Sequence, residues 1–396
     1  MKEWKKNILL TFFSITFALL LGEGVVRLVE EKPVNIVQPD PVLKFTVTPG
    51  ADIDANGFRN PQVLTQADIV TFGDSMSAGS GVTSAEAWPS VLGELAGASV
   101  YNMAVSGYGP VQYAKLAEGA AALHPKIALV GLYTGNDLFD AYELAYSFDA
   151  WKELRDPSFA TATAPESQAD AEIRTQVLAG AKKGTFAYYT YTVRYFVRQH
   201  VHLYALLGDA SRSIREKLGL AHTESEKLAD VTKLGGEDPS LAFVYDKDEK
   251  TQTILSAVYR RDVVDLSVPT TKEGWRISEN RLHVMAEQFR KSSTTMIVVI
   301  IPTKELAYTL YMDKTGDAYP RALKEYQTKE LQLVASIQVY CATEKIACLD
   351  VTQAYVDAID AKVGAFKPVM DGHPAAPGYR VIAETVFDYL KTQNLI

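Results

Sequence analysis

Short apolar runs rich in β-branched residues alternate with helical patterns along this chain, and this alternation is what most constrains its fold. Five such runs occur, at residues 69–72, 100–103, 127–133, 295–301 and 347–351. A final amphipathic pattern covers residues 378–390. Apolar strands separated by helices are typical of a parallel sheet covered on both faces. The sequence therefore predicts an α/β fold of three layers, with the sheet in the middle.

The alternation stops near residue 150 and resumes only before the fourth run. The intervening stretch is polar and rich in alanine at first, and then shows apolar side chains at helical spacing over residues 186–207. We interpret residues 151–285 as an insertion between the third and fourth core strands. The two halves of the core are then residues 66–150 and 286–396.

The N-terminus differs in composition from the rest of the chain. Lysines within the first six residues precede an uncharged, apolar run at residues 7–22. This order fits either a membrane anchor or a secretory signal, and no small-x-small cleavage site follows it. We therefore expect residues 1–32 to be an anchor or signal and residues 33–65 to be a linker and N-terminal extension. Both alternatives place the rest of the chain outside the cytoplasm, on the membrane or at the cell surface.

Charge and cysteine content exclude several classes of protein. The formal net charge of −8 argues against nucleic-acid binding, which normally requires a basic face. Cys341 and Cys348 could form a disulfide in an oxidising compartment, or could be two small buried apolar residues. We expect no metal site, because no His or Cys cluster adjoins them. No dinucleotide or phosphate-binding loop is present, so no cofactor is expected.

Polar loops follow the predicted strands. Ser75 comes after the first strand, Gly107 after the second and Asn136 after the third, while His373 lies in the loop before the last helix. The carboxyl ends of parallel strands meet at one edge of a sheet, and ligands bind there. We therefore expect these four residues to lie close together although some 300 residues of sequence separate the first from the last.

The residue types at this edge are those that acyl transfer requires. Ser75 could act as the nucleophile and His373 as its general base, with Asp371 orienting the imidazole ring. The backbone N–H groups of Ser75 and Gly107 and the side-chain amide of Asn136 could stabilise an oxyanion. The sequence therefore predicts a serine-nucleophile site.

This set of residues resembles the SGNH hydrolases, also called GDSL-type esterases. Gly73-Asp74-Ser75 corresponds to the serine block, Gly107 to the glycine block and Gly135-Asn136-Asp137 to the asparagine block, and Asp371 with His373 corresponds to the last block. The blocks occur in the family's order. The resemblance implies a flavodoxin-like fold of three α/β/α layers and the hydrolysis of esters, often on carbohydrates or lipids.

The last block departs from the family pattern. The family usually places Asp three residues before His, where this chain has Met370, whereas Asp371 stands only two residues before His373. The shorter spacing resembles a subset of membrane-anchored proteins of bacterial cell-surface polysaccharide systems. A Ser-His dyad whose ring is oriented by a backbone carbonyl remains the alternative to a triad.

Each site residue also has an ordinary structural interpretation. Gly73-Asp74-Ser75 could be a capped strand-to-helix turn, Gly107 could allow a tight turn, and Asn136 could cap a helix. Lys304, after the fourth strand, could contact an anionic group of the substrate or pair with a neighbouring acid. Tyr108, beside Gly107, is a further candidate for substrate contact.

Three functional hypotheses follow. The first is an esterase that removes acetyl or another small acyl group from a carbohydrate outside the cytoplasm. The second is an O-acetyltransferase, in which a sugar hydroxyl instead of water attacks the same acyl-enzyme. The third is a non-catalytic module of a polysaccharide assembly complex, which would not need all four blocks. The oligomeric state stays open.

Overall fold

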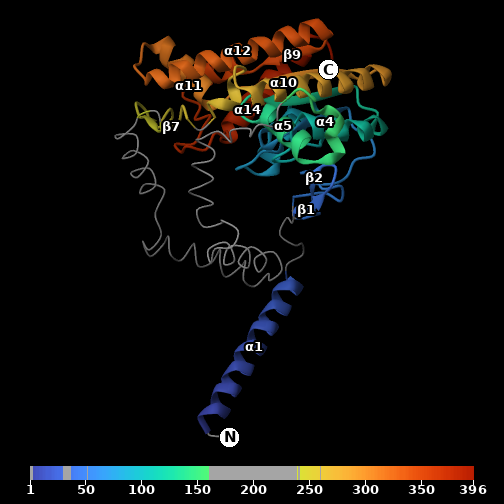
Figure 1. The fold of residues 1–396 in the computed structure, drawn as a ribbon, viewed down its shortest axis with the longest axis vertical. Coiled ribbons are helices and arrows are strands. Elements are labelled where there is room, and N and C mark those ends of the chain that lie inside the picture. Colours follow the sequence, from blue (N-terminus) through green and yellow to red (C-terminus); the bar gives the residue numbers. More distant parts are fainter. Residues whose placement is uncertain (1–2, 30–36, 51, 160–238, 240, 259) are drawn as a thin grey trace.

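The computed structural model describes residues 3–29, 37–50, 52–159, 239, 241–258 and 260–396 (Figure 1). Most of the predicted insertion, including the helix expected at residues 186–207, lies outside the described residues. The described residues include the two halves of the core and segments that pack on them.

A five-stranded parallel sheet forms the centre of the domain. Its strands lie in the order β4-β3-β5-β8-β9. Their bounds are β3 (Ile69–Gly73), β4 (Val100–Asn102), β5 (Ile127–Tyr133), β8 (Thr295–Ile301) and β9 (Ala347–Asp350). The second strand lies outside the first, and the later strands follow on the other side, which is the flavodoxin-like order with a switch point between β3 and β5. The predicted α/β fold is therefore confirmed.

The strands are apolar on both faces because helices cover both. Side chains of a strand alternate between faces, so Ile127 and Leu129 of β5 pack in one apolar cluster while Ala128 and Val130 pack in the other. Four helices cover the first face: α3 (Trp88–Ala96), α11 (Lys304–Thr315), α13 (Thr352–Asp360) and α14 (Ala376–Thr392).

Four further helices cover the second face. They are α4 (Pro110–Ala120), α5 (Asp137–Ser147), α10 (Pro269–Lys291) and α12 (Arg321–Glu344). Helix α10 lies alongside α4 and α5 (Figure 1). It begins at Pro269, inside the stretch predicted as an insertion, so the second half of the core starts earlier than residue 286.

Short elements connect these layers. Helix α2 (Ser75–Ala78) follows β3 directly. The described part of the predicted insertion contains an antiparallel hairpin, β6 (Phe243–Tyr245) with β7 (Thr253–Leu255). Short 3₁₀ segments occur at η1 (Ser84–Glu86), η2 (Ala121–Leu123), η3 (Asp149–Leu154) and η4 (Asp262–Val264).

The N-terminal extension forms regular structure instead of a loose linker. Strands β1 (Val37–Asp40) and β2 (Lys44–Val47) pair as an antiparallel hairpin. The following turn is tied to the sheet, because the Tyr101 hydroxyl of β4 donates to Asp54 Oδ2 at 2.8 Å and Asn60 Nδ2 donates to the Asn102 carbonyl at 2.9 Å. These buried hydrogen bonds hold the extension against the β4 edge.

The N-terminal segment forms helix α1 (Glu3–Val29). Among the residues that the structure describes, no helix is long and apolar enough to cross a membrane. The predicted membrane-spanning helix is therefore not supported. The uncharged stretch at residues 7–22 is shorter than the about 20 apolar residues that a span usually needs.

Candidate active site

Ser75 lies where β3 ends and α2 begins. The turn is capped by Asp74, whose Oδ1 accepts from the Met76 N–H at 2.8 Å, and the helix ends at Gly79 in the left-handed conformation. The N–H groups of Gly79 and Ser80 donate to the Ser75 carbonyl at 3.1 and 3.0 Å. The serine backbone is therefore held from both sides. Asp74 is fully buried, and this burial raises the pKa of its carboxyl.

His373 and Asp371 meet Ser75 at this point. His373 Nε2 lies 2.8 Å from Ser75 Oγ, and Nδ1 lies 2.6 Å from Asp371 Oδ1. A proton on Nδ1 facing the carboxylate leaves Nε2 free to accept from the serine hydroxyl. The other neighbour of Ser75 Oγ, Asp74 Oδ2, is farther away at 3.3 Å. The structure thus joins three residues separated by up to 298 positions into one hydrogen-bonded chain.

Asp371 reaches the ring despite its shortened spacing because the contact is local. Its Oδ1 accepts from the backbone N–H of His373 at 3.2 Å as well as from the ring. A carboxylate that bonds the backbone two residues ahead forms an Asx-type turn, which brings the two side chains together. The hydrogen bond from His373, together with the local charges, lowers the pKa of Asp371 to about 2. The carboxylate is therefore ionised at neutral pH.

The two predicted side contributions to an oxyanion hole follow β4 and β5, the strands on either side of β3, and their surroundings differ. Gly107 follows β4 with φ of 84°, a left-handed conformation that favours glycine. Asn136 Nδ2 already donates to Asp140 Oδ2 at 2.6 Å, while its buried Oδ1 has no hydrogen-bond partner in the described part of the chain. Against the larger effect of burial, a hydrogen bond from Asn136 also lowers the pKa of the Asp74 carboxyl, so the amide interacts with two carboxyl groups.

Asp140, the hydrogen-bond partner of Asn136, is a further titratable group of the site. Burial raises the pKa of its carboxyl to about 7. Sequence reasoning missed Asp140, although its spacing of four residues from Asn136 at the start of a helix was a usable signal.

Asp137, the last residue of the asparagine block, has a structural place. It is fully buried, and its carboxyl accepts from the Tyr133 N–H at 2.9 Å and the Tyr113 hydroxyl at 3.0 Å. Burial raises the pKa of this carboxyl well above its ordinary value. These bonds fix the loop that presents Asn136.

Lys304 lies within reach of the charges of Glu305 and Asp371, and its hydrogen bonds go to main-chain carbonyls. The side chain is fully buried at the start of α11, and Nζ donates to the carbonyls of Val369 at 2.6 Å and Asp371 at 3.1 Å. It therefore holds the loop that carries Asp371 and His373. Burial lowers the pKa of Lys304 to about 8.

Tyr108, the other candidate for substrate contact, is buried against the N-terminal extension. Its side chain is buried, its hydroxyl donates to the Phe45 carbonyl, and its ring packs on that of Phe45 with centroids 5.3 Å apart. Tyr108 thus fastens the β1–β2 hairpin to the Gly107 loop.

Two arginines near the site were missed because nothing in their local sequence marks them. Arg59 donates to the carbonyls of Ala78, Gly79 and Val82, at 3.0, 2.5 and 2.8 Å, and pairs with Asp52 at 2.7 Å. It therefore grips the segment that follows the nucleophile helix.

The second arginine lies beside the asparagine block. Arg260 Nη1 donates to the Gly135 carbonyl at 2.6 Å, and the guanidinium lies over the Tyr133 ring, 5.2 Å from its centroid. It thus braces the other side of the oxyanion loop. Within the described ranges, no group of three or more His, Cys, Asp or Glu residues is suited to bind a metal.

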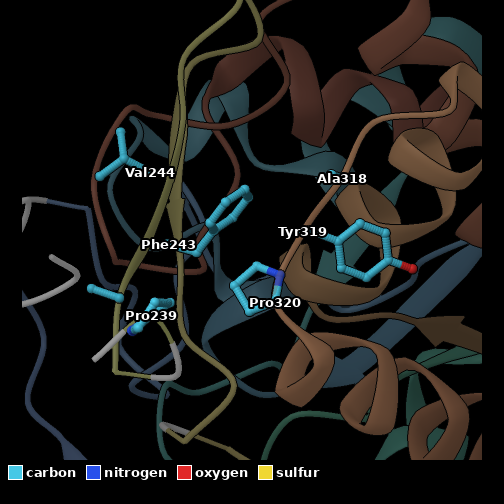
Figure 2. Close-up of a pocket in the computed structure, with 7 residues that line it drawn as sticks. Pro239, Phe243, Val244, Ala318, Tyr319 and Pro320 are labelled. Carbon is cyan, nitrogen blue, oxygen red and sulfur yellow. The ribbon is translucent and has the colours of Figure 1, made fainter. Parts of the chain in front are cut away.

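Two cavities differ in their position relative to the site. One, of about 580 Å³, lies between β6 and the segment before α12, and Figure 2 shows Phe243 and Tyr319 lining it. None of its lining residues belongs to the predicted site. The other, of about 410 Å³, is lined by residues on both sides of Ser75 in sequence, among them Ser80 and Ser106.

Cys341 and Cys348 form a disulfide with a Cα–Cα distance of 6.1 Å. It connects the end of α12 to β9 across a short turn. Disulfides persist mainly in oxidising compartments.

No protein-family model matches the chain, and no curated protein matches it. Two solved structures are similar to it in part. TesA shows 12% sequence identity over 82% of this chain and 98% of its own, with a TM-score of 0.33. The protein YxiM of Bacillus subtilis shows 11% identity over 88% of this chain and 65% of its own, with a TM-score of 0.37. At such low scores the likeness carries no argument about activity, so the assignment of the site depends on its own geometry.

Proposed function

We propose that this protein is a serine esterase that works through an acyl-enzyme. The observation that carries the proposal is the continuous chain from Ser75 Oγ through His373 to Asp371, with contacts of 2.8 and 2.6 Å. A nucleophile, a base and an orienter within hydrogen-bond reach are what nucleophilic catalysis requires. Their position at the switch point of the sheet is where ligands bind in this class of fold.

The first half of the reaction forms the acyl-enzyme. Ser75 Oγ attacks the ester carbonyl carbon as its proton passes to His373 Nε2. The oxyanion then accepts hydrogen bonds from the backbone N–H groups of Ser75 and Gly107 and from the amide of Asn136. Cleavage of the C–O bond releases the alcohol, which takes the proton from His373.

The second half frees the enzyme. Water attacks the acyl carbon while His373 takes one of its protons, and the same donors hold the second oxyanion. Collapse breaks the bond to Ser75 Oγ, which recovers the proton, and the carboxylic acid leaves. Throughout, the Asp371 carboxylate holds the ring and stabilises the imidazolium, as the orienting acid of a triad does.

The finer assignment follows the family resemblance described above. We propose a small-acyl ester of a carbohydrate outside the cytoplasm as the substrate, and the disulfide supports an oxidising location. Transfer of the acyl group to a sugar hydroxyl is the alternative outcome of the same intermediate. Incubation with a labelled acyl donor, with and without polysaccharide, separates the two, since label found only in free acid counts against transfer.

The test of the proposal is Ser75→Ala assayed on p-nitrophenyl acetate. Loss of the nucleophile should reduce kcat by about a thousandfold or more and abolish labelling by a fluorophosphonate probe. Ser84→Ala, which removes a hydroxyl of η1 outside the site, serves as the matched control and should retain both. Turnover by Ser75→Ala close to that of the wild type would refute the assignment. Failure of the wild type to react with the probe would favour the non-catalytic module instead.

A further inference from the structure

The cavity of about 410 Å³ beside Ser75 is built largely from segments outside the two core halves. The β1–β2 hairpin and the turn after it form one wall, and the loops after β4 and α2 form the other. Most of its lining side chains are apolar, namely Val37, Phe45, Val47, Ile53, Ala104 and Val105. A volume of this size is within the range of small-molecule sites, which are mostly apolar.

The cavity shares loops with the catalytic groups, although none of Ser75, Gly107 or His373 lines it. Ser80 lines it, and the N–H of Ser80 donates to the Ser75 carbonyl at 3.0 Å. Ser106 lines it from the opposite side and precedes Gly107, and the hydroxyls of Ser80 and Ser106 are 3.1 Å apart. A Cβ atom at Gly107 would lie 3.5 Å from the Phe45 ring, so the apolar wall touches the predicted oxyanion loop.

The charged residues in the lining compensate one another. Arg59 pairs with Asp52 at 2.7 Å, and the rest of its guanidinium donates to main-chain carbonyls. Because these two charges pair with each other, we do not expect either of them to bind an ionic ligand. Apolar surface is the larger part of what the cavity offers.

We infer that this cavity binds an aliphatic chain of the ester substrate. The inference rests on the proposed esterase function and narrows its substrate class to esters whose acyl or alcohol part carries several methylene groups. An acetyl group alone would leave the cavity empty. An acylated carbohydrate meets the requirement when its acyl group is longer than acetyl.

Two ester series distinguish the two possible sources of the chain. The first varies the acyl part, from p-nitrophenyl acetate to butyrate, hexanoate and octanoate. The second keeps the acetyl group and varies the alcohol, from methyl to hexyl. For the wild type, kcat/KM should rise at least about tenfold along one of the series, because each buried methylene strengthens binding. The series in which it rises identifies the part of the ester that enters the cavity.

A variant that fills the cavity tests the location. Val37 lies at the rim and its side chain is 44% exposed, so Val37→Trp can occupy the cavity with little strain on the core. In this variant the ratio of kcat/KM for hexanoate to that for acetate, or for the hexyl ester to that for the methyl ester, should lie within about threefold of unity. Turnover of p-nitrophenyl acetate should stay within about twofold of the wild type. Val363→Trp changes a similarly exposed valine outside the cavity, at 42%, and should behave like the wild type.

The outcomes separate this inference from the proposed function. A flat profile in both series, or a profile that Val37→Trp leaves unchanged, overturns the cavity inference while acetate turnover still supports the esterase. Absence of turnover in every series, together with no fluorophosphonate labelling, overturns both.

Discussion

The two ends of the catalytic chain are held in different ways. Ser75 belongs to a turn that is capped by buried Asp74, bonded through its own carbonyl and gripped by Arg59. His373 lies in a loop between Phe366 and the start of α14, with its side chain 25% exposed and that of Asp371 56% exposed. Lys304 donates to this loop from beneath.

This difference separates fixed from adjustable parts of the site. The nucleophile is positioned by hydrogen bonds from its own turn and from Arg59. The base depends on a bridge between Phe366 and Pro374 and on one buried lysine. We therefore expect disturbance at the serine end to appear mainly as lost stability, and disturbance at the histidine end mainly as lost rate.

The largest effect should come from His373→Ala. Without a base, kcat on p-nitrophenyl acetate should fall by about ten-thousand-fold, which corresponds to about 5.5 kcal/mol in the barrier. Ser75 and His373 act as a unit, so the double variant Ser75→Ala/His373→Ala should be no slower than the slower of the two single variants. A double variant that is a further hundredfold slower would show that the two residues act independently.

Arg59→Met tests how much the segment around Ser75 depends on the hydrogen bonds of Arg59. Loss of the guanidinium leaves the carbonyls of Ala78, Gly79 and Val82 without their charged donor, and we expect the free energy of unfolding to fall by about 4 kcal/mol. Chemical denaturation measures this change. Arg321→Met, on the exposed side of α12, is the control and should cost less than about 0.5 kcal/mol.

The same variant also tests whether stability and rate are separable here. After titration of active sites with a fluorophosphonate, kcat of Arg59→Met should stay within about threefold of the wild type, since Asp74 still caps the turn. If Arg59→Met were as stable as the wild type but had a roughly tenfold lower kcat, the expectation that changes near Ser75 act mainly on stability would be wrong.

The pH dependence of stability should reveal the buried charge of Lys304. Burial lowers its pKa from 10.5 to about 8 in the folded protein, so between these values the unfolded chain binds the extra proton. Stability from this group therefore rises with pH over that window, by on the order of 3 kcal/mol. The difference in unfolding free energy between the wild type and Lys304→Met should grow in favour of the wild type from pH 8 to pH 10.5. A constant difference would show that Lys304 does not titrate there.

The smallest effect expected is on the rate of Lys304→Met at neutral pH. Without the two hydrogen bonds to Val369 and Asp371 the loop should sample wrong positions, lowering kcat about tenfold with KM nearly unchanged. Neutral lysine can still donate to both carbonyls, so the defect should be equal at pH 7 and pH 9.5. Lys314→Met, on the same helix but exposed, should have no effect. A defect that disappears at high pH would assign the effect to charge instead of positioning.

Much of the fold could be predicted because it follows from local patterns. The apolar runs at residues 127–133 and 295–301 became β5 and β8, since a strand that is buried on both faces needs an almost uninterrupted apolar run. The hairpin at residues 37–47 was not anticipated, because the hydrogen bond that fastens it comes from Tyr108, 63 residues from Phe45 in sequence.

The sequence by itself determined the strand-end serine, the histidine loop and the parallel sheet whose edge joins them, because motif spacing and hydrophobic period are local properties. Only the tertiary structure decided what surrounds them. Lys304 bonds carbonyls 65 and 67 residues away, and Arg59 holds the segment after Ser75. Such partners depend on how distant loops pack at the sheet edge, and hydrogen bonds to main-chain carbonyls carry no side-chain signature that a sequence could show.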